Sequence, residues 1–131
     1  MAELNEQQLV DFKLLLRARA TQLRSEIRQT LERSAEESHV RIAEQARDTE
    51  DDSFSNLIVD VNLAEIERDA AELRRIDNAM ARITAGSYGQ CIDCGRQIPL
   101  ARLQAEPTAS RCVHCQELYE KTHATTPTPS L

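Results

Sequence analysis

Residues 1–85 contain neither glycine nor proline, the two residues that most often interrupt a helix. This stretch is rich in Ala, Leu, Glu, Arg and Gln, whose side chains suit a helix. We therefore expect residues 6–85 to be helical. No apolar run approaches the roughly 18 residues that a membrane span requires, and the first residues lack the basic and apolar regions of a signal peptide. The sequence thus predicts a cytoplasmic protein that has no contact with membranes.

Apolar residues recur in two separate stripes within this helical stretch, with a spacing close to seven residues. Such spacing is typical of helices that pack along a seam. The earlier stripe comprises Leu9, Phe12, Leu16, Ala20, Leu23, Ile27 and Leu31. The later stripe comprises Val59, Leu63, Ile66, Ala70, Leu73, Ile76, Met80 and Ile83. Polar residues that interrupt the register are Arg19, Thr30 and Asp77. Each stripe needs an apolar partner.

The segment between the two stripes, residues 47–53, holds no large apolar residue. Its short polar side chains prefer turns and helix caps to helix interiors. We therefore predict an all-α protein built on a long antiparallel coiled-coil hairpin, with Asp52 or Ser53 capping the second helix. The alternative is one helix of about 80 residues that dimerises as a coiled coil, and the oligomeric state stays open.

Four cysteines form two Cys-x-x-Cys pairs that are separated by 17 residues. Two such pairs can surround one tetrahedral zinc ion, and Gly95 after the second cysteine suits a zinc knuckle. A reducing cytosol disfavours disulfides, and the regular spacing is less typical of an iron–sulfur cluster. A competing ligand within the second pair is His114. The sequence predicts a structural Zn²⁺ site at Cys91, Cys94, Cys112 and Cys115.

The composition restricts both the core and the function. Only 3% of the residues are aromatic, so zinc, which can supply on the order of 10 kcal/mol of coupled folding free energy, is expected to stabilise the cysteine-rich part. The formal net charge of −6 argues against direct DNA binding, because phosphates attract basic surfaces. The sequence shows no nucleophile–base pairing, no phosphate-binding glycine loop and no open metal position, so we expect no enzymatic activity.

Acidic residues cluster between the two predicted helices. Residues 44–60 contain six acids against one basic residue, Arg47. A charge run of this kind is usually a solvated turn. It can also be a carboxylate cluster that meets a metal ion or a basic surface inside a partner, and composition does not decide between the two.

The cysteine-rich segment resembles the zinc-finger signature of the DksA/TraR family of bacterial transcription factors. The matching residues are 86–95, Ile98, Arg102, Leu103, Ala105, 107–109 and 112–115. The resemblance implies an all-α protein whose coiled-coil arm enters the secondary channel of bacterial RNA polymerase. The arm would bring acidic tip residues near the active site and modulate promoter complexes without contacting DNA.

The resemblance also implies which residues form the tip. The family motif Asp-x-x-Asp-x-Ala falls on Asp48 and Asp51, with Ser53 where the family has Ala. Some family members bind the alarmone ppGpp through basic residues at the junction of finger and arm. The corresponding positions here are Arg75, Glu106 and Gln116. Because an acid repels a polyanion, we expect a weak or absent response to ppGpp.

These inferences combine into one predicted organisation and three candidate functions. Residues 1–85 would form the hairpin with its tip near 48–53, residues 86–123 a zinc finger with a short C-terminal helix, and residues 124–131 a disordered tail. The favoured function is transcriptional regulation through RNA polymerase. The alternatives are an adaptor that binds another protein and a redox sensor whose thiolates release zinc on oxidation.

Overall fold

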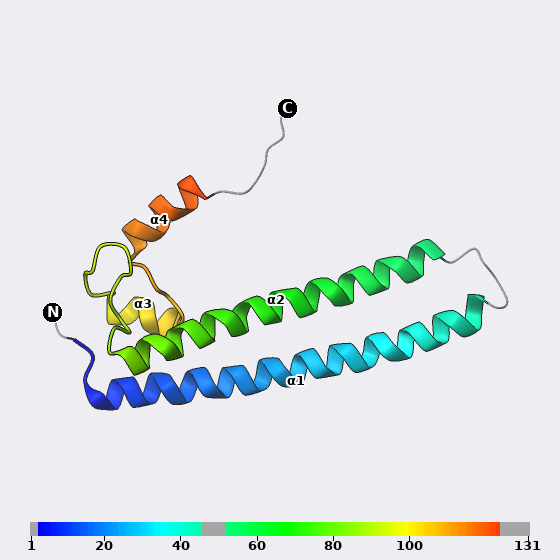
Figure 1. Cartoon of the computed structure of the whole chain (residues 1–131), viewed down its shortest axis with the longest axis horizontal. Helices are drawn as coiled ribbons and strands as arrows, with labels where there is room; N and C mark the ends of the chain where they lie inside the picture. The colour runs from blue at the N-terminus through cyan, green and yellow to red at the C-terminus, as the bar shows by residue number, and fades with distance from the viewer. Residues whose placement is uncertain (1–2, 46–51, 124–131) are drawn as a thin grey trace. The chain divides into compact units, whose positions relative to one another are not determined.

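The computed structural model describes residues 3–45 and 52–123, and the side chains of residues 3–37 and 60–123. This part of the chain is helical (Figure 1), with one isolated antiparallel bridge between Gln90 and Gln97 and no strand. The helices are α1 (Glu6–Gln45), α2 (Asp52–Ala85), α3 (Leu100–Ala105) and α4 (Val113–Thr122). The chain divides into two compact units, Arg17–Ile76 and the combination of Met1–Leu16 with Asp77–Leu131.

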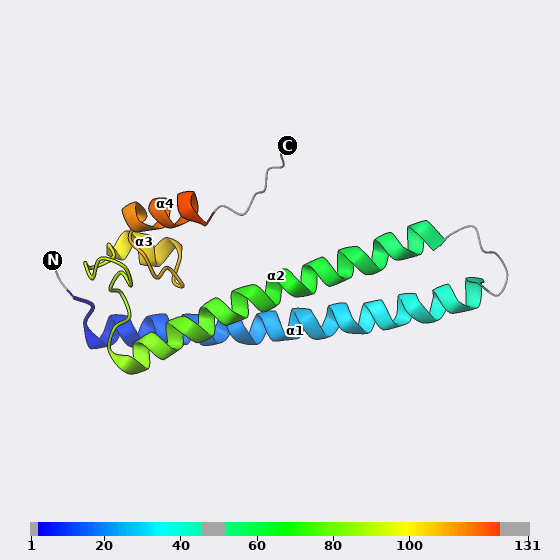
Figure 2. The ribbon, with the colours of Figure 1, turned by 45° about the horizontal axis from the view of Figure 1, so that its top comes forward.

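Within Arg17–Ile76, α1 and α2 lie side by side and run antiparallel (Figures 1 and 2). Ion pairs fix the direction, because Arg19 binds Glu72 whereas Arg33, further along α1, binds Glu65, which comes earlier in α2. The prediction of a helical hairpin is therefore confirmed, and one unbroken helix is excluded. The first residue of α2 is Asp52, but the side chains that would cap this helix lie outside the described residues.

The seam between these helices differs in detail from the predicted stripes. Leu31 and Leu63, both assigned to the seam, have exposed fractions of 54% and 52%. Their neighbours Thr30 and Asn62 are buried instead, with exposed fractions of 6% and 4%. Successive side chains on a helix point about 100° apart, so burying one residue turns the next toward solvent. The polar residue that seemed to interrupt the register, Thr30, therefore occupies the seam.

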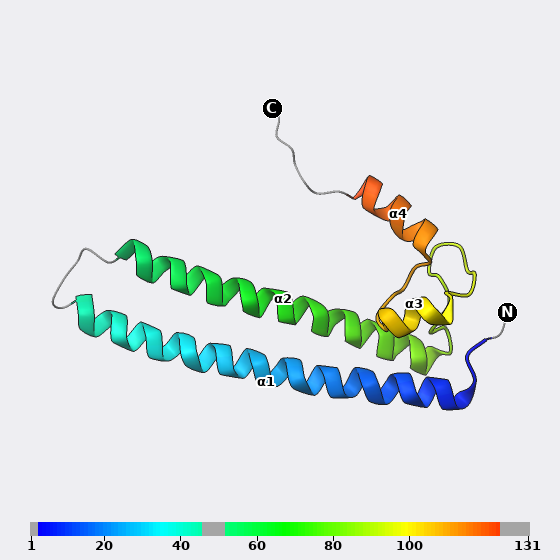
Figure 3. The same cartoon turned by 180° about the vertical axis from the view of Figure 1, so that it is seen from behind.

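The other unit packs α3 and the cysteine-rich loops against the first turns of α1 and the last turns of α2 (Figure 3). Its most buried residues are Phe12, Leu16, Ala79, Tyr88, Cys91, Ile98, Leu103, Ala109 and Cys115. The helix α2 ends at Ala85, and Gly86 follows it with a φ of +84°, a left-handed conformation that glycine adopts without strain. The next residue, Ser87, donates its backbone N–H to the carbonyl of Arg82 at 2.9 Å and completes the helix end.

Of the two short helices, one was predicted from the sequence and the other was not. The C-terminal helix α4 matches the short closing helix predicted there. In contrast, α3 was not predicted; the proline at its N-cap, Pro99, and the apolar pattern that follows are the signals for it. The tail at residues 124–131 lies outside the described residues, and the predicted domain limits stay a prediction. None of the helices in the described part is long and apolar enough to cross a membrane.

Candidate metal centre

The four cysteine sulfurs converge on one point although the two pairs are far apart in the sequence. All four sulfur atoms lie within 4.8 Å of one another, and the Sγ atoms of Cys94 and Cys112 are 3.9 Å apart. The innermost thiols belong to Cys91 and Cys115, which are buried, whereas Cys94 is exposed. The predicted ligands are therefore brought together as a single cluster.

Glycine at position 95 lets the first Cys-x-x-Cys pair turn back on itself. Its φ is +76°, and a Cβ atom there would meet nothing within 4 Å, so the backbone conformation rather than space favours glycine. The Gly95 N–H donates to the carbonyl of Cys91 at 3.0 Å, and the Cys94 N–H points at the Cys91 sulfur at 3.5 Å. The knuckle that the sequence suggested is thus formed.

The second pair begins α4, and α3 holds it in place. Cys112 is the N-cap residue of α4, and Cys115 lies in its first turn. The Arg102 guanidinium of α3 donates from Nε to the carbonyl of Arg111 at 2.9 Å, directly before Cys112. The helix α3, which was not predicted, therefore holds the segment that leads into the second cysteine pair.

The thiols differ in acidity because of their surroundings. Burial by itself raises the pKa of Cys91, but hydrogen bonds from neighbouring backbone N–H groups, chiefly those of Cys94 and Cys112, outweigh it and lower that pKa to about 6. Burial and the adjacent thiols raise the pKa of Cys115 to about 12. Thiolates packed this closely repel one another, and a divalent cation at their centre offsets that repulsion.

The donor set fits zinc. Four cysteine sulfurs suit the tetrahedral coordination of Zn²⁺ and leave no position for water or substrate. The alternative ligand His114 is exposed and does not belong to the cluster. A set of four sulfur ligands is typical of a closed, structural zinc site.

Beside the cluster, a charged and aromatic arrangement joins the two cysteine pairs. Arg111 donates from Nε to Asp93 Oδ2 at 2.7 Å, and its guanidinium carbon lies 3.9 Å from the ring centre of Tyr119. On Tyr119 the ring of His123 is also stacked, with the two ring centres 4.1 Å apart. His123, interpreted from the sequence as a solvated helix position, thus packs on α4, and these contacts brace the pairs from outside.

The finger is also tied to the start of α1 through a buried tyrosine. The Tyr88 ring lies 5.5 Å from that of Phe12, and its hydroxyl donates to the carbonyl of Pro107 at 2.7 Å. Burial raises the pKa of Tyr88 to about 12. This role was not predicted, since in the sequence Tyr88 is only a member of the finger signature.

We expect Tyr88→Phe to lower the stability of the zinc-loaded protein by about 1–2 kcal/mol, because it leaves the partly buried Pro107 carbonyl without its donor. Thermal unfolding measures this change. The matched control is Tyr119→Phe, at an exposed tyrosine whose hydroxyl makes no hydrogen bond within the described residues. Equal melting temperatures for both variants would contradict the assignment. Because the folded pKa is raised from 10.0 to about 12, this stabilisation is complete below pH 10 and is lost as the pH rises toward 12.

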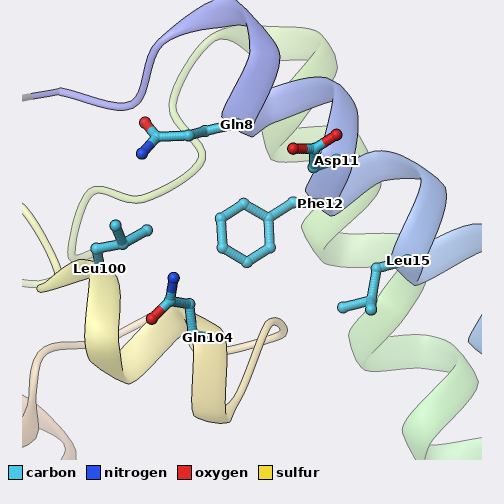
Figure 4. Close-up of a pocket in the computed structure, with 6 residues that line it drawn as sticks. All are labelled: Gln8, Asp11, Phe12, Leu15, Leu100 and Gln104. Carbon is cyan, nitrogen blue, oxygen red and sulfur yellow. The ribbon is translucent and has the colours of Figure 1, made fainter.

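A groove of about 260 Å³ lies between α1 and α3 in the same unit (Figure 4). The Phe12 ring forms its centre, between Leu15 of α1 and Leu100 of α3. The polar residues that line it are Gln8, Asp11 and Gln104. This lining supplies one carboxylate and two amides, without a nucleophile and base pair, and is typical of a packing surface with a polar rim.

Comparisons with known proteins agree with this geometry. Residues 86–121 match the model of the prokaryotic dksA/traR C4-type zinc finger. The RNA polymerase-binding transcription factor DksA of Caulobacter vibrioides is 33% identical over 120 residues, which cover 90% of this chain and 80% of that protein. The chain belongs to the DksA/TraR family. The C4 finger of this family and the clustered sulfurs together establish zinc as the cofactor.

Solved structures of DksA/TraR proteins extend the similarity to the whole fold. Transcription factor DksA2 from Pseudomonas aeruginosa matches with a TM-score of 0.76 at 28% identity, over 92% of this chain and 88% of that one. The RNA polymerase binding protein and transcriptional regulator Dks from Chlamydia trachomatis L2 matches with a TM-score of 0.51 at 28% identity, over 94% and 99% of the two chains. The family resemblance and the fold class predicted from the sequence are confirmed.

The remaining predicted site residues of this DksA/TraR protein are not tested by the geometry. Asp48 and Asp51 lie outside the described residues, and Ser53 lies in α2 without a described side chain. Among the alarmone positions, Arg75 and Glu106 are exposed, and a Glu106 oxygen lies 3.9 Å from the Arg102 guanidinium. The roles of the tip and the weak alarmone response stay predictions.

Proposed function

We propose that this DksA/TraR protein regulates bacterial transcription by binding RNA polymerase through its secondary channel. The observation that carries the proposal is the extent of similarity to relatives named RNA polymerase-binding transcription factors. That similarity covers 90% of the chain and so includes both the helical arm and the finger. The alternative, an adaptor whose hairpin binds another protein, would share the fold but would not bind RNA polymerase.

In this proposal zinc has a structural role. Each Cys-x-x-Cys pair supplies two thiolates, so the ion cross-links the segment after α2 to the start of α4. The ion itself contributes folding free energy rather than Lewis-acid chemistry, because four sulfurs close its coordination. The proposed ligands are Cys91, Cys94, Cys112 and Cys115.

The proposed regulatory contacts come from the acidic residues between α1 and α2. Asp48 and Asp51 interact electrostatically and through hydrogen bonds with elements of the polymerase active site, with Ser53 beside them. A protein that binds one state of a promoter complex better than another shifts the population toward that state. The protein acts in the cytoplasm without enzymatic activity, direct DNA contact or a strong ppGpp response.

A binding experiment tests the proposal directly. Zinc-loaded protein is expected to be retained by core RNA polymerase near one-to-one stoichiometry and to change transcript yield in a purified system. The variant Asp60→Asn/Glu67→Gln removes two exposed acids of α2 outside the proposed tip and should bind equally well. Absence of retention with the zinc site filled would favour the adaptor hypothesis.

A further inference from the structure

Hydrogen bonds join the two Cys-x-x-Cys pairs without involving the cysteine sulfurs. The backbone N–H of Ile92, inside the first pair, donates to the carbonyl of Ser110 at 2.9 Å. The side chain of Arg111, directly before the second pair, donates from Nε to Oδ2 of Asp93 at 2.7 Å, and Asp93 also lies inside the first pair. The protein therefore links the two pairs directly, although 17 residues separate them in the sequence.

The Arg111 side chain is held by more than this one ion pair. Its guanidinium carbon lies 3.9 Å from the ring centre of Tyr119 in α4, which is close enough for a cation–π contact. Its backbone carbonyl accepts the hydrogen bond from Arg102 of α3 at 2.9 Å. Only 18% of the Arg111 side chain is exposed. Because backbone and side chain are both fixed, Arg111 loses little further freedom when it binds Asp93.

These contacts of Arg111 lie beside the sulfur cluster. A groove of about 350 Å³ is lined by Asp93, Arg111 and Tyr119 together with the buried Cys115. Tyr119 follows Cys115 by four residues, so the two side chains lie on the same face of α4. Asp93, Arg111 and Tyr119 thus connect the first cysteine pair with the second next to a buried sulfur.

A link between the pairs affects how a zinc ion leaves a site of this kind. Release requires the ion to lose its bonds to one pair, and that pair must then move away before a competing ligand takes the ion. A link keeps the detached thiolates close to the ion, which raises their effective concentration and favours rebinding. Contacts outside the ligand set can therefore change metal retention, as partners of the ligands do in other metal sites.

We infer that Asp93, Arg111 and Tyr119 form a clasp that slows the release of zinc by holding the two cysteine pairs together. Arg111 is the central member, because it contacts the other two. All three are positioning residues that act through the cysteines and are not zinc ligands. A partly exposed ion pair contributes little by itself, so the clasp acts together with the ion and does not replace it. The inference rests on the proposed zinc ligands and not on binding to RNA polymerase.

Transfer of zinc from the loaded protein to an excess of the chromogenic chelator pyridylazoresorcinol measures the release rate. We expect Arg111→Gln to release zinc about tenfold faster than the natural chain, because it breaks the contacts with both Asp93 and Tyr119. The matched control is Arg96→Gln, which removes the same charge from an exposed arginine that forms no ion pair within the described residues. This control should release zinc at the natural rate.

The variant Asp93→Ala separates a clasp from an effect of charge alone. If only the net charge near the sulfurs mattered, Asp93→Ala and Arg111→Gln would change the release rate in opposite directions, because they remove opposite charges. In a clasp both variants release zinc faster, and we expect about threefold for Asp93→Ala. The double variant should stay within about twofold of Arg111→Gln, because the carboxylate has no partner once Arg111 is gone.

The tyrosine supplies an independent test with a conservative partner. Tyr119→Phe keeps the ring face on which Arg111 lies and should release zinc at the natural rate. Tyr119→Leu removes that face and should release zinc about threefold faster. This pair of variants carries the test should Arg111→Gln fail to fold, as judged by the Tyr88 resonances.

Equal release rates for Arg111→Gln, Arg96→Gln and the natural chain would overturn the inference. Opposite effects of Asp93→Ala and Arg111→Gln, or effects that multiply in the double variant, would show that the two residues act separately and would overturn it too. A natural chain that holds no zinc would overturn the proposed ligand set and the clasp with it. If the natural chain fails to bind polymerase while the clasp variants lose zinc faster, the proposed function fails and the clasp stands.

Discussion

Replacement of Asp48 and Asp51 by asparagine is expected to reduce the effect on transcription at least tenfold while polymerase binding stays unchanged. Asparagine keeps the size of the side chain but removes both negative charges, so the contacts proposed at the active site lose their electrostatic part. In vitro transcription with saturating protein measures the effect, and retention on core polymerase measures binding.

The control for the tip variant makes the same change in net charge at residues outside the tip. Asp60→Asn/Glu67→Gln removes two exposed carboxylates from α2 and should regulate like the natural chain. If both double variants lose the effect equally, the net charge rather than the tip is responsible. If the tip variant regulates normally, Asp48 and Asp51 are not the acting residues.

Loss of zinc is expected to unfold the finger while most of the helical signal remains. A tetrathiolate zinc site supplies on the order of 10 kcal/mol of coupled binding and folding free energy, which few aromatic contacts can replace. The cluster contains two buried thiols, so Cys91→Ser or Cys115→Ser should have the largest effect. Far-ultraviolet circular dichroism follows the helices, and the resonances of Tyr88 report on the finger.

The metal experiment has a matched control and a clear contrary outcome. His114→Ala alters the exposed residue between Cys112 and Cys115 and should leave both zinc content and the finger intact. Retention on polymerase should fall for the cysteine variants and not for the histidine variant. A finger that keeps its native Tyr88 signals after metal removal, verified by metal analysis, would show that zinc does not stabilise it.

The fold could be predicted because its signals are local. The absence of glycine and proline before Gly86 predicted long helices, and the polar segment near their middle predicted the hairpin. The spacing of the cysteines predicted the cluster, since two short pairs can enclose one ion whatever connects them. In each case, the residues that predict the feature lie close together in the sequence.

Which residues occupy the interior was decided by contacts between elements distant in sequence. The pattern alone favours Leu31 and Leu63 for the seam, yet Thr30 and Asn62 are buried there because Asn62 finds Glu37 and Arg33 on the facing helix. The sequence by itself predicted the two long helices, their hairpin arrangement and the four cysteines whose sulfurs cluster. Only the tertiary structure decided which residues face the seam, because a polar side chain such as that of Asn62 is buried where partners on the other helix satisfy its hydrogen bonds.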